Sequence, residues 1–519
     1  MAGFRAAGFA ALFAFFGAMS ASAQDVTLTS RDGGVEISGD LLGYDGEFYR
    51  VDTIYGELTV DGSGVTCEGP GCPNLADYVA ELRMSGASAL GAVMMPALLE
   101  TFAGINGYVA RGRRDGETGF HYDLYDGDTD ALVARFDFGS TTTSEGFADL
   151  LTDEADIALA TREIRPEERE RARDAGLGDL ADARRSRILA LDAIVPIVSP
   201  GNPVQEIQPQ DLALAFAGRI TNWQDLGGPD APIALHLADA GTGLGQLVED
   251  RLLAPAQLTL DAQVTRHARS LAVADAVTAD PFALGIASFA ETGDAQILTL
   301  TGACGFPLRP DRFTIKTEDY PLTTPIFTYL PARRLPKIGR EFVAFLRSPE
   351  AQLVIRRVGF VDQTPEEIPV AAQGRRLSNA ILAAGEEIPL EELQRMAVTL
   401  SPMRRLTISF RFETGSIRLD AQSRANVLGL AHMLEVGRYD GRKLVFMGFS
   451  DGEGAARANR EIALKRAEAV RYAVMDAAQA SDLRRVTLEV DAFGEALPLA
   501  CDDSAWGRKS NRRVEVWVR

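Results

Sequence analysis

Apolar and polar residues alternate along the first part of the chain, residues 25–76. Val26 and Leu28 show the two-residue spacing, and Asp32-Gly33-Gly34 is one of several glycine-rich turns between short apolar runs. A spacing of two with frequent turns is typical of β-strands that bury one face. This part of the chain is therefore predicted to form a small β module with a structural or docking role.

The longest part of the chain, residues 78–370, alternates short apolar runs with helical patterns. The run Ala193–Val198 is continuously apolar and ends at turn residues, which is typical of a buried strand. Behind Pro209, which the first turn of a helix tolerates, apolar residues recur at helical spacing as far as Phe216. Strands that alternate with helices predict an α/β domain.

Residues 120–138 are an exception within this domain, because they alternate on both sides of an acidic tip. The tip, Asp126–Asp130, has the D-x-D-x-D spacing of a calcium loop, with Asp137 at the twelfth position. Ala131, however, occupies the position at which such a loop needs Gly. The segment is therefore predicted to be a β-hairpin with a solvated tip, and no metal site is expected.

A polar, helical stretch at residues 371–400 leads to the last domain, residues 401–519. Gly374, Gly385 and Pro389 interrupt this stretch, which is predicted to be a linker with some ordered helix. In the last domain, strand and helix patterns follow one another in the order βαβαββ. The chain as a whole is thus predicted to be a multidomain α/β protein.

Residues 1–23 have the pattern of a signal peptide. Arg5 provides a positive charge, Phe9–Met19 is apolar, and Ala21-Ser22-Ala23 forms a small-residue cleavage site. The apolar run is too short for a membrane span, and no Cys follows the cleavage site to carry a lipid anchor. We expect cleavage after Ala23 and export to an oxidising compartment, in the simplest case the bacterial periplasm.

The four cysteines of the chain fit that compartment. Cys67 and Cys72 flank a Pro-Gly turn that brings the chain back on itself, so a local disulfide is predicted. A zinc site is the alternative for this spacing, but no second pair of Cys or His lies nearby in the sequence. Whether Cys304 and Cys501 pair with each other is open, because four cysteines allow three pairings.

The charge balance excludes one class of partner. The 519 residues carry a formal net charge of −20. Nucleic acid is therefore not expected as a partner, because neutralising its phosphates requires a basic face. A small anion is compatible with this charge, because a local pocket can be positive in an acidic protein.

Three loops before predicted helices carry small or hydroxyl residues, which is the pattern of an anion site. Such residues leave backbone N–H groups free and add hydroxyl donors at the start of a helix, where the dipole favours negative charge. Each loop by itself is equally compatible with an ordinary turn or helix N-cap. The residues concerned are Ser85, Gly86 and Ser88 in the first loop, Thr143 and Ser144 in the second, and Gly241 and Thr242 in the third.

The segment 191–228 supports an anion site, because its pattern NPV…L…F.G.ITNW..LGG resembles that of PstS-type phosphate-binding proteins. The resemblance extends over nearly all of residues 80–365. It implies a two-lobed, type II-like periplasmic-binding-protein fold that holds a small oxyanion, phosphate first, in the cleft between its lobes. It also adds Thr161 and Arg162 to the expected ligand residues, and it leaves open whether an ABC transporter is engaged.

His236 is the main departure from that family, whose members carry Arg at the corresponding position of the phosphate-binding loop. A tight oxyanion site usually combines N–H donors with one bidentate cation. The resemblance therefore implies that His236 contributes to binding. It also implies that binding is weaker than in true phosphate receptors, or that it depends on pH.

Residues 404–519 carry a second resemblance, to the OmpA-like peptidoglycan-binding domain, an α/β sandwich. The shared motif reads G-x-[ST]-D…N…RA..V…NRRVE and includes Asp451 and, fifteen positions later, Arg466. The resemblance implies that these two residues grip the diaminopimelate zwitterion of peptidoglycan, because a zwitterion needs one carboxylate and one cationic partner. The alternative is that Arg466 only covers the core with its stem.

Together these features predict a periplasmic solute-binding protein for phosphate or a similar small oxyanion, tethered non-covalently to peptidoglycan at the cell wall or outer membrane. The alternative is an envelope scaffold whose receptor-like domain has lost its ligand and docks a partner. An enzyme is not expected, since the chain has no G-x-S-x-G or H-E-x-x-H motif and only four scattered His. No cofactor is expected either.

Overall fold

The computed structural model describes residues 25–75, 78–88, 90–115, 119–385, 387–413, 416–480 and 482–519, and the predicted signal peptide lies outside these ranges. The protein falls into two compact units, Met1–Tyr78 and Val79–Arg519. Each unit has a hydrophobic core of its own.

The first unit contains the predicted β module, folded as an antiparallel sheet with the strand order β4-β3-β2-β1-β5. Val26 and Leu28 of β1 and Val51 of β3 point to one side and form its buried core. The expected disulfide joins Cys67 to Cys72. The strands are β1 (Val26–Ser30), β2 (Glu36–Tyr44), β3 (Phe48–Thr53), β4 (Gly56–Asp61) and β5 (Val65–Glu68).

The receptor-like part of the second unit consists of two lobes that share one mixed sheet. Its strand order is β14-β13-β15-β11-β18-β10-β6-β9-β8-β7. The long strand β11 (Ser186–Val198) pairs with β18 (Thr323–Tyr329) through its first half and with β15 through its second half. It therefore passes from lobe 1, on the β10 side, to lobe 2, on the β15 side. This is the two-lobed α/β fold expected from the sequence.

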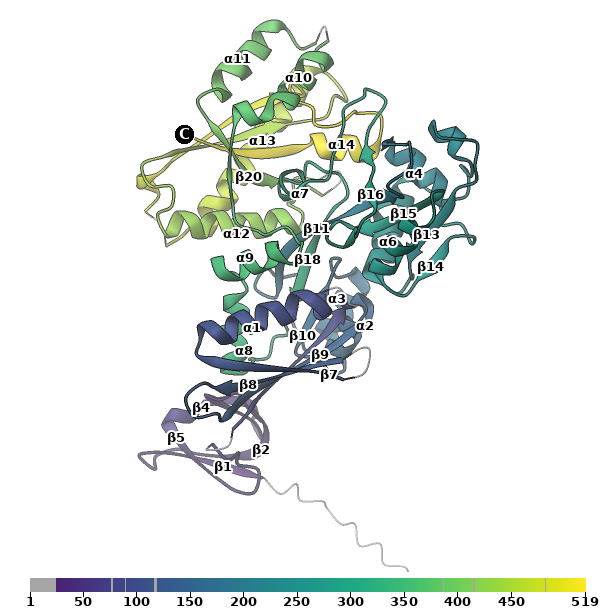
Figure 1. Ribbon diagram of the computed structural model, residues 1–519. Coiled ribbons are helices and arrows are strands. Elements are labelled where there is room, and N and C mark those ends of the chain that lie inside the picture. The colour runs from purple at the N-terminus through teal and green to yellow at the C-terminus, as the bar shows by residue number, and fades with distance from the viewer. Residues whose placement is uncertain are drawn as a thin grey trace, which may run out of the picture. The chain divides into compact units, whose positions relative to one another are not determined.

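Helices cover both lobes of this sheet (Figure 1). Lobe 1 contains β6 (Ala80–Ala87), β7 (Tyr108–Asp115), β8 (Gly119–Asp126), β9 (Leu132–Thr141), β10 (Ile157–Ala160), α1 (Met95–Ile105), α2 (Thr143–Leu151), α3 (Pro166–Asp174), α8 (Lys337–Phe345) and α9 (Pro349–Arg357). Lobe 2 contains β12 (Glu206–Ile207), β13 (Ala234–Ala238), β14 (Thr265–His267), β15 (Ala283–Ser288), β16 (Gln296–Ile297), β17 (Thr299–Leu300), α4 (Pro209–Phe216), α5 (Gly243–Val248), η4 (Glu249–Leu253), α6 (Ser270–Ala279) and α7 (Arg312–Lys316).

The segment with the clearest sequence pattern forms the core of lobe 2. Ala193–Val198 is the second half of β11 and is buried throughout. Helix α4 begins at Pro209, as predicted, and packs its apolar face into the same core. Trp223 is fully buried, and its Nε1 donates a hydrogen bond to the carbonyl oxygen of Phe282 at 2.8 Å. This bond holds the returning chain next to β15.

Strands β8 and β9 of lobe 1 form the predicted hairpin. They pair in antiparallel fashion, and the acidic tip forms the turn between them. The carboxylate of Asp126 accepts hydrogen bonds from the backbone N–H groups of Asp128 and Thr129, at 3.1 and 2.8 Å. This carboxylate therefore has donors within its own turn, which agrees with the hairpin interpretation of the acidic spacing.

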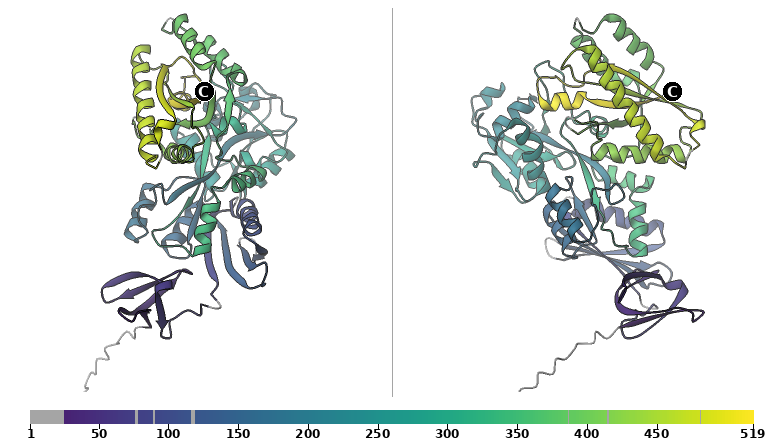
Figure 2. Two further views of the ribbon diagram at one scale, coloured as in Figure 1. Left: turned by 90° about the vertical axis from the view of Figure 1, so that its left-hand side faces the viewer. Right: turned by 180° about the vertical axis from the view of Figure 1, so that it is seen from behind.

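The C-terminal part of the second unit is a sheet with the order β19-β20-β23-β21-β22 between two layers of helices. Helices α12 and α13 pack on one face, and α10 and α11 on the other (Figure 2). The stretch expected to link the domains thus forms the second helical layer. The elements are β19 (Glu367–Pro369), α10 (Gly374–Ala383), α11 (Leu390–Leu400), β20 (Arg404–Phe410), α12 (Ala421–Glu435), β21 (Lys443–Phe449), α13 (Ala456–Ala477), β22 (Thr487–Gly494), α14 (Ala505–Asn511) and β23 (Arg513–Val518).

Within the described ranges, no helix is both long enough and apolar enough to cross a bilayer.

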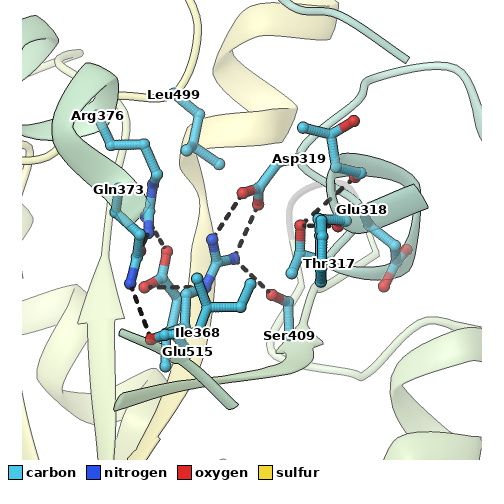
Figure 3. Close-up of polar contacts among 12 residues, drawn as sticks. Thr317, Glu318, Asp319, Ile368, Gln373, Arg376, Ser409, Leu499 and Glu515 are labelled. Atoms are coloured by element: carbon cyan, nitrogen blue, oxygen red, sulfur yellow. Dashed lines mark hydrogen bonds and ion pairs between the residues drawn. The ribbon is translucent and has the colours of Figure 1, made fainter. Parts of the chain in front are cut away.

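A buried polar network joins the C-terminal part to the receptor-like part (Figure 3). Arg405 of β20 donates to both carboxylate oxygens of Asp319 at 2.6 and 2.9 Å, and its Nε lies 3.3 Å from the carboxylate of Glu515. Glu515 also accepts from Arg376 of α10 and, at 2.7 Å, from Arg513. Except for Arg376, which is partly exposed, these residues are buried, so their charges depend on protein partners rather than on water.

The C-terminal part contacts both lobes of the receptor-like part. Arg424 of α12 pairs with Glu163 of lobe 1 at 2.9 Å. Trp506 of α14 donates from Nε1 to the carbonyl oxygen of Arg251 in lobe 2 at 2.8 Å. A disulfide joins Cys304 of lobe 2 to Cys501. The two cysteines whose pairing could not be predicted from the sequence therefore pair with each other.

Candidate functional site

Two of the three predicted loops meet where lobe 1 faces lobe 2. Thr143 is the first residue of α2, and Thr161 directly follows β10. Their hydroxyl oxygens are 3.2 Å apart, and the backbone N–H of Thr161 donates to the Thr143 hydroxyl at 3.2 Å. The start of α2 is fixed by a capping box between Thr142 and Glu145. The hydroxyl groups of Thr143 and Thr161 therefore have defined positions.

The third loop approaches the same hydroxyl groups from lobe 2. A Cβ atom at Gly243 would lie only 1.7 Å from Oγ1 of Thr161 and 3.1 Å from Oγ1 of Thr143. Only glycine allows the lobes to come this close. Thr242, which precedes it, caps α5 by accepting from the N–H of Gly245 at 3.1 Å. The lobes are thus in contact at the predicted anion loops.

Gln246 of α5 bridges the lobes and was not predicted from the sequence. Its amide nitrogen donates to the hydroxyl of Ser144 at 3.0 Å, and its amide oxygen accepts from Nε of Arg162 at 2.7 Å. Both partners belong to lobe 1. No sequence motif marks this Gln, because its role depends only on where α5 packs.

Arg162 is buried and uses its guanidinium within the protein. It forms a bidentate pair with Glu168 at 2.7 and 2.8 Å, and it also donates to Ser144, Gln246 and the carbonyl oxygen of Glu163. These bonds occupy all five N–H donors of the side chain. In this structure Arg162 therefore positions Ser144 and Gln246 and has no donor left for an anion.

The first predicted loop turns its hydroxyl group into lobe 1. Ser85, in β6, is buried, and its Oγ donates to the carboxylate of Asp149 at 2.5 Å. Gly86 has a positive φ of 140°, and a Cβ there would lie 2.0 Å from the carbonyl oxygen of Leu159. Glycine is needed at this position so that β6 can pack against β10. Ser88 is half-buried and lies before the π-helix η2 (Leu90–Met94), which leads into α1.

His236 lies in β13, where it faces another histidine. Its Nδ1 is 2.9 Å from Nε2 of His267 in β14. Burial, followed by the nearby His267, lowers the pKa of His236 below its ordinary value, while Asp280 opposes this shift. His236 is therefore neutral near pH 7, and the structure does not place a cation there for an oxyanion.

The second predicted site lies in the C-terminal part, at the end of β21. Asp451 is nearly buried, and its carboxylate accepts from Arg512 at 2.5 Å. The neighbouring N–H of Gly452 donates to the carboxylate of Asp502 at 2.8 Å, which fixes the loop. Asp451 thus lies in a largely dry position with Arg512 as its ion-pair partner.

Arg466 of α13 lies beside this pair. Its guanidinium is stacked 5.3 Å from the ring centre of Phe412, and among the described residues its buried Nε has no hydrogen-bond partner. Burial, and then repulsion by Arg512, lowers the pKa of Arg466, whereas Asp451 raises it. The structure therefore brings Asp451 and Arg466 together and adds Arg512, which the sequence analysis did not single out.

The two-lobed fold with hydroxyl-bearing loops at the lobe interface defines a class of solute-binding proteins, and comparison with known families agrees. The family model of the PBP superfamily domain matches residues 79–350, more than half of the chain. The protein therefore belongs to the PBP superfamily. The model of the OmpA family matches residues 411–512, so a C-terminal OmpA domain follows the PBP-like domain.

Individual proteins are similar over the PBP-like domain. Protein SphX of Synechococcus elongatus is 26% identical over 253 residues, which cover 46% of this chain and 72% of SphX. The phosphate-binding protein PstS of Borreliella burgdorferi is 24% identical over 215 residues, covering 40% and 71%. An ABC-type phosphate transport receptor from Vibrio cholerae is 20% identical with a TM-score of 0.41, covering 54% of this chain and 99% of the receptor.

Proposed function

We propose that the protein is a solute-binding protein for phosphate or a similar small oxyanion, and that it performs no catalysis. The observation that supports this most is the meeting of Thr143, Thr161 and the loop before Gly243 at the lobe interface. Hydroxyl and N–H donors at the starts of helices suit an oxyanion, because they supply hydrogen bonds and a favourable dipole. The proteins of similar sequence include phosphate-binding PstS.

We further propose that the OmpA domain tethers this receptor to peptidoglycan in the periplasm, at the cell wall or outer membrane. Asp451 would accept the ammonium group of diaminopimelate, and Arg466 would bind the adjacent carboxylate. The buried Nε of Arg466, which lacks a hydrogen-bond partner among the described residues, supports this role, because a buried donor without a partner is costly unless a ligand satisfies it. Arg512 would exchange its contact with Asp451 for one with the ligand carboxylate.

A second candidate function is an envelope scaffold whose receptor-like domain binds no solute. Two observations favour it. The N–H donors of Arg162 are hydrogen-bonded to Glu168 and neighbouring groups. His236 is neutral and paired with His267. A tight oxyanion site usually contains a cation that can make two hydrogen bonds. The scaffold would dock a protein partner instead, and the binding experiment below distinguishes the two functions.

Calorimetric titration of the full mature chain with phosphate and with sulfate tests the receptor. We expect binding by the wild type and at least about tenfold weaker binding by Gly243→Ala, because the new methyl group displaces the Thr161 hydroxyl and one hydrogen bond to a charged ligand contributes about 1.5–3 kcal/mol. Gly201→Ala is the matched control, since a Cβ there meets open space. Absence of binding of either anion by the wild type would favour the scaffold.

Co-sedimentation with purified sacculi tests the tether. Asp451→Asn and Arg466→Gln should each release the protein into the supernatant, because truncating one side of a buried charge pair costs roughly 2–5 kcal/mol. Lys465→Gln is the control, since it removes an exposed positive charge from the same helix. If both site variants still sediment like the wild type, these residues do not bind peptidoglycan.

A further inference from the structure

A cavity of about 280 Å³ lies where the two lobes and the OmpA domain meet. It adjoins the proposed oxyanion loops, because Thr161 and Arg162 form part of its wall. Lobe 1 also contributes Glu163 and Arg165, and the rest of the wall comes from three sources. Lobe 2 contributes Leu247, Asp250 and Arg251. The region before and within β18 contributes Glu318, Tyr320 and Phe327. The OmpA domain contributes Arg411, Asp420, Gln422 and Lys509.

Arg251 and Lys509 differ from the other charged groups of this wall. Arg165 pairs with Asp250 at 3.0 Å, and Glu163 pairs with Arg424 at 2.9 Å. The side chains of Arg251 and Lys509 have neither a hydrogen bond nor an ion pair within the part of the chain that the structure describes. They come from different domains and face the same cavity. The cavity therefore contains two cations without a dedicated counter-ion.

The two cations are close enough to affect each other. The Arg251 guanidinium, together with desolvation of the ammonium group, lowers the pKa of Lys509 to about 8, although the residue as a whole remains exposed. Asp420 and Glu318 oppose this shift, while Arg411 adds to it. An anion between Arg251 and Lys509 would relieve this repulsion, because it attracts both groups.

The acidic residues of the wall compensate the two cations only in part. The carboxylate of Asp420 caps α12 by accepting from the N–H of Ser423 at 2.9 Å. Burial raises the pKa of Glu318 to about 8, with Asp420 as the second cause, so Glu318 is largely protonated near neutral pH. Its buried Oε1 also has no hydrogen-bond partner among the described residues. The cavity thus offers positive charge and an unused polar atom.

We propose that Arg251 and Lys509 form a second anion subsite, and that the OmpA domain thereby completes the ligand site of the receptor. The preferred ligand would be a small phosphate compound with a second anionic group, rather than inorganic phosphate alone. The first anionic group would occupy the oxyanion loops, and the second would lie between Arg251 and Lys509. Pro321, Pro325 and Phe327 provide an apolar wall for the part of the ligand between them. This inference rests on the proposed receptor function.

Calorimetric titration of the full mature chain with inorganic pyrophosphate and with inorganic phosphate tests the subsite. The wild type should bind pyrophosphate at least about tenfold more tightly, because the second group gains charge-assisted hydrogen bonds. The double variant Arg251→Gln/Lys509→Gln should lose this preference and bind the two anions with similar affinity. The control Arg457→Gln/Lys465→Gln removes the same charge from exposed positions of α13 and should keep the preference.

A second measurement uses the unaltered protein. Amine acylation at about pH 8, read out by mass spectrometry, should modify Lys509, because an ammonium group with a lowered pKa is deprotonated at that pH. Pyrophosphate should protect Lys509 at concentrations at which phosphate does not. Equal protection by both anions, or none by pyrophosphate, would overturn the subsite.

The failure of this inference and that of the proposed function give different results. Equal affinity of the wild type for both anions, or a preference that persists in the double variant, overturns the subsite and leaves the receptor function intact. Absence of binding of both anions by the wild type overturns the receptor function and the subsite together.

Discussion

The N-terminal module and the OmpA domain both flank the receptor fold, but only the OmpA domain shares a compact unit with it. The N-terminal module has a core of its own, and its disulfide joins cysteines 5 positions apart. The disulfide of the OmpA domain joins cysteines 197 positions apart and reaches lobe 2 of the receptor. One addition to the receptor is therefore self-contained, whereas the other is built into it.

Buried charge explains much of this difference. Arg405 and Asp319 come from the two sides of the domain junction and lie in contact away from water. Burial tends to raise the pKa of Asp319, but the attraction of Arg405 is stronger and lowers it, so the pair stays charged. Desolvating such a pair is costly, and its benefit lies in fixing one geometry. We infer that this pair specifies how the OmpA domain docks.

The docked OmpA domain also touches both lobes, through Glu163 in lobe 1 and the carbonyl oxygen of Arg251 in lobe 2. A movement that separated the two lobes would have to break the contacts of the OmpA domain with at least one lobe. In this protein the proposed anchor and the proposed receptor therefore cannot move as independently as two domains on a flexible linker.

The largest effect is expected from breaking the buried pair. Arg405→Met removes two hydrogen bonds to the carboxylate of Asp319, and among the described residues its remaining ion-pair partner is Arg411, at 3.9 Å. The free energy of unfolding of the large unit should fall by about 3–5 kcal/mol, as measured by denaturant titration. Arg404→Met, at the exposed neighbouring position, should have little effect. Adding Asp319→Leu to Arg405→Met should recover part of the lost stability. If Arg405→Met does not lower the free energy of unfolding and the second substitution recovers none of it, the pair does not hold the junction.

A somewhat smaller effect is expected from removing the long-range disulfide. The variant Cys304→Ser/Cys501→Ser should lose about 2–4 kcal/mol, because the cross-link no longer restricts the unfolded chain. Differential scanning calorimetry should show the transition of the large unit at a lower temperature under non-reducing conditions. An unchanged transition would mean that the buried contacts alone hold the OmpA domain in place.

Removing the short disulfide should affect only the N-terminal module. The loop closed by Cys67 and Cys72 is short, so the variant Cys67→Ser/Cys72→Ser should lose about 2 kcal/mol. The transition of the large unit should not move, in contrast to the preceding variant. If it does move, the N-terminal module is not the self-contained unit described here.

The sequence predicted those parts of the fold whose signals are local. Ala193–Val198 and the helix from Pro209 follow directly from apolar periodicity, and the Cys67–Cys72 bond follows from a turn of a few residues. The pairing of Cys304 with Cys501 and the contact of Arg405 with Asp319 depend on how two distant segments pack. No pattern along the chain encodes such packing.

The same distinction applies to the candidate sites. The motif spacing singled out Asp451 and Arg466, and the structure brings them together, whereas Arg512 joins them only through the fold. At the lobe interface, the hydroxyl residues could be proposed from their place before helices. The bridging role of Gln246 could not be predicted, because it depends on side chains more than eighty positions away.

The smallest expected effect concerns Glu318, which lies at the junction between the receptor and the OmpA domain. Burial raises the pKa of this carboxyl from 4.5 to about 8. Between these pH values the folded protein holds a proton that the unfolded chain releases, so the unfolded state binds fewer protons. The stability of the wild type therefore falls as pH rises through this window.

Glu318→Gln removes this dependence, because an amide does not ionise. The variant should match the wild type at about pH 5 and be more stable by about 1 kcal/mol at about pH 8. This value is well below the free energy that corresponds to the full pKa shift, because the side chain is not completely shielded from solvent. Thermal unfolding at several pH values measures the difference, with the exposed Glu154→Gln as control. Above about pH 8 the lowered pKa of Lys509 acts in the opposite direction, so the comparison ends there. A constant difference across the window would mean that Glu318 is not protonated in the folded protein, and that the OmpA domain does not shield this part of the junction from water.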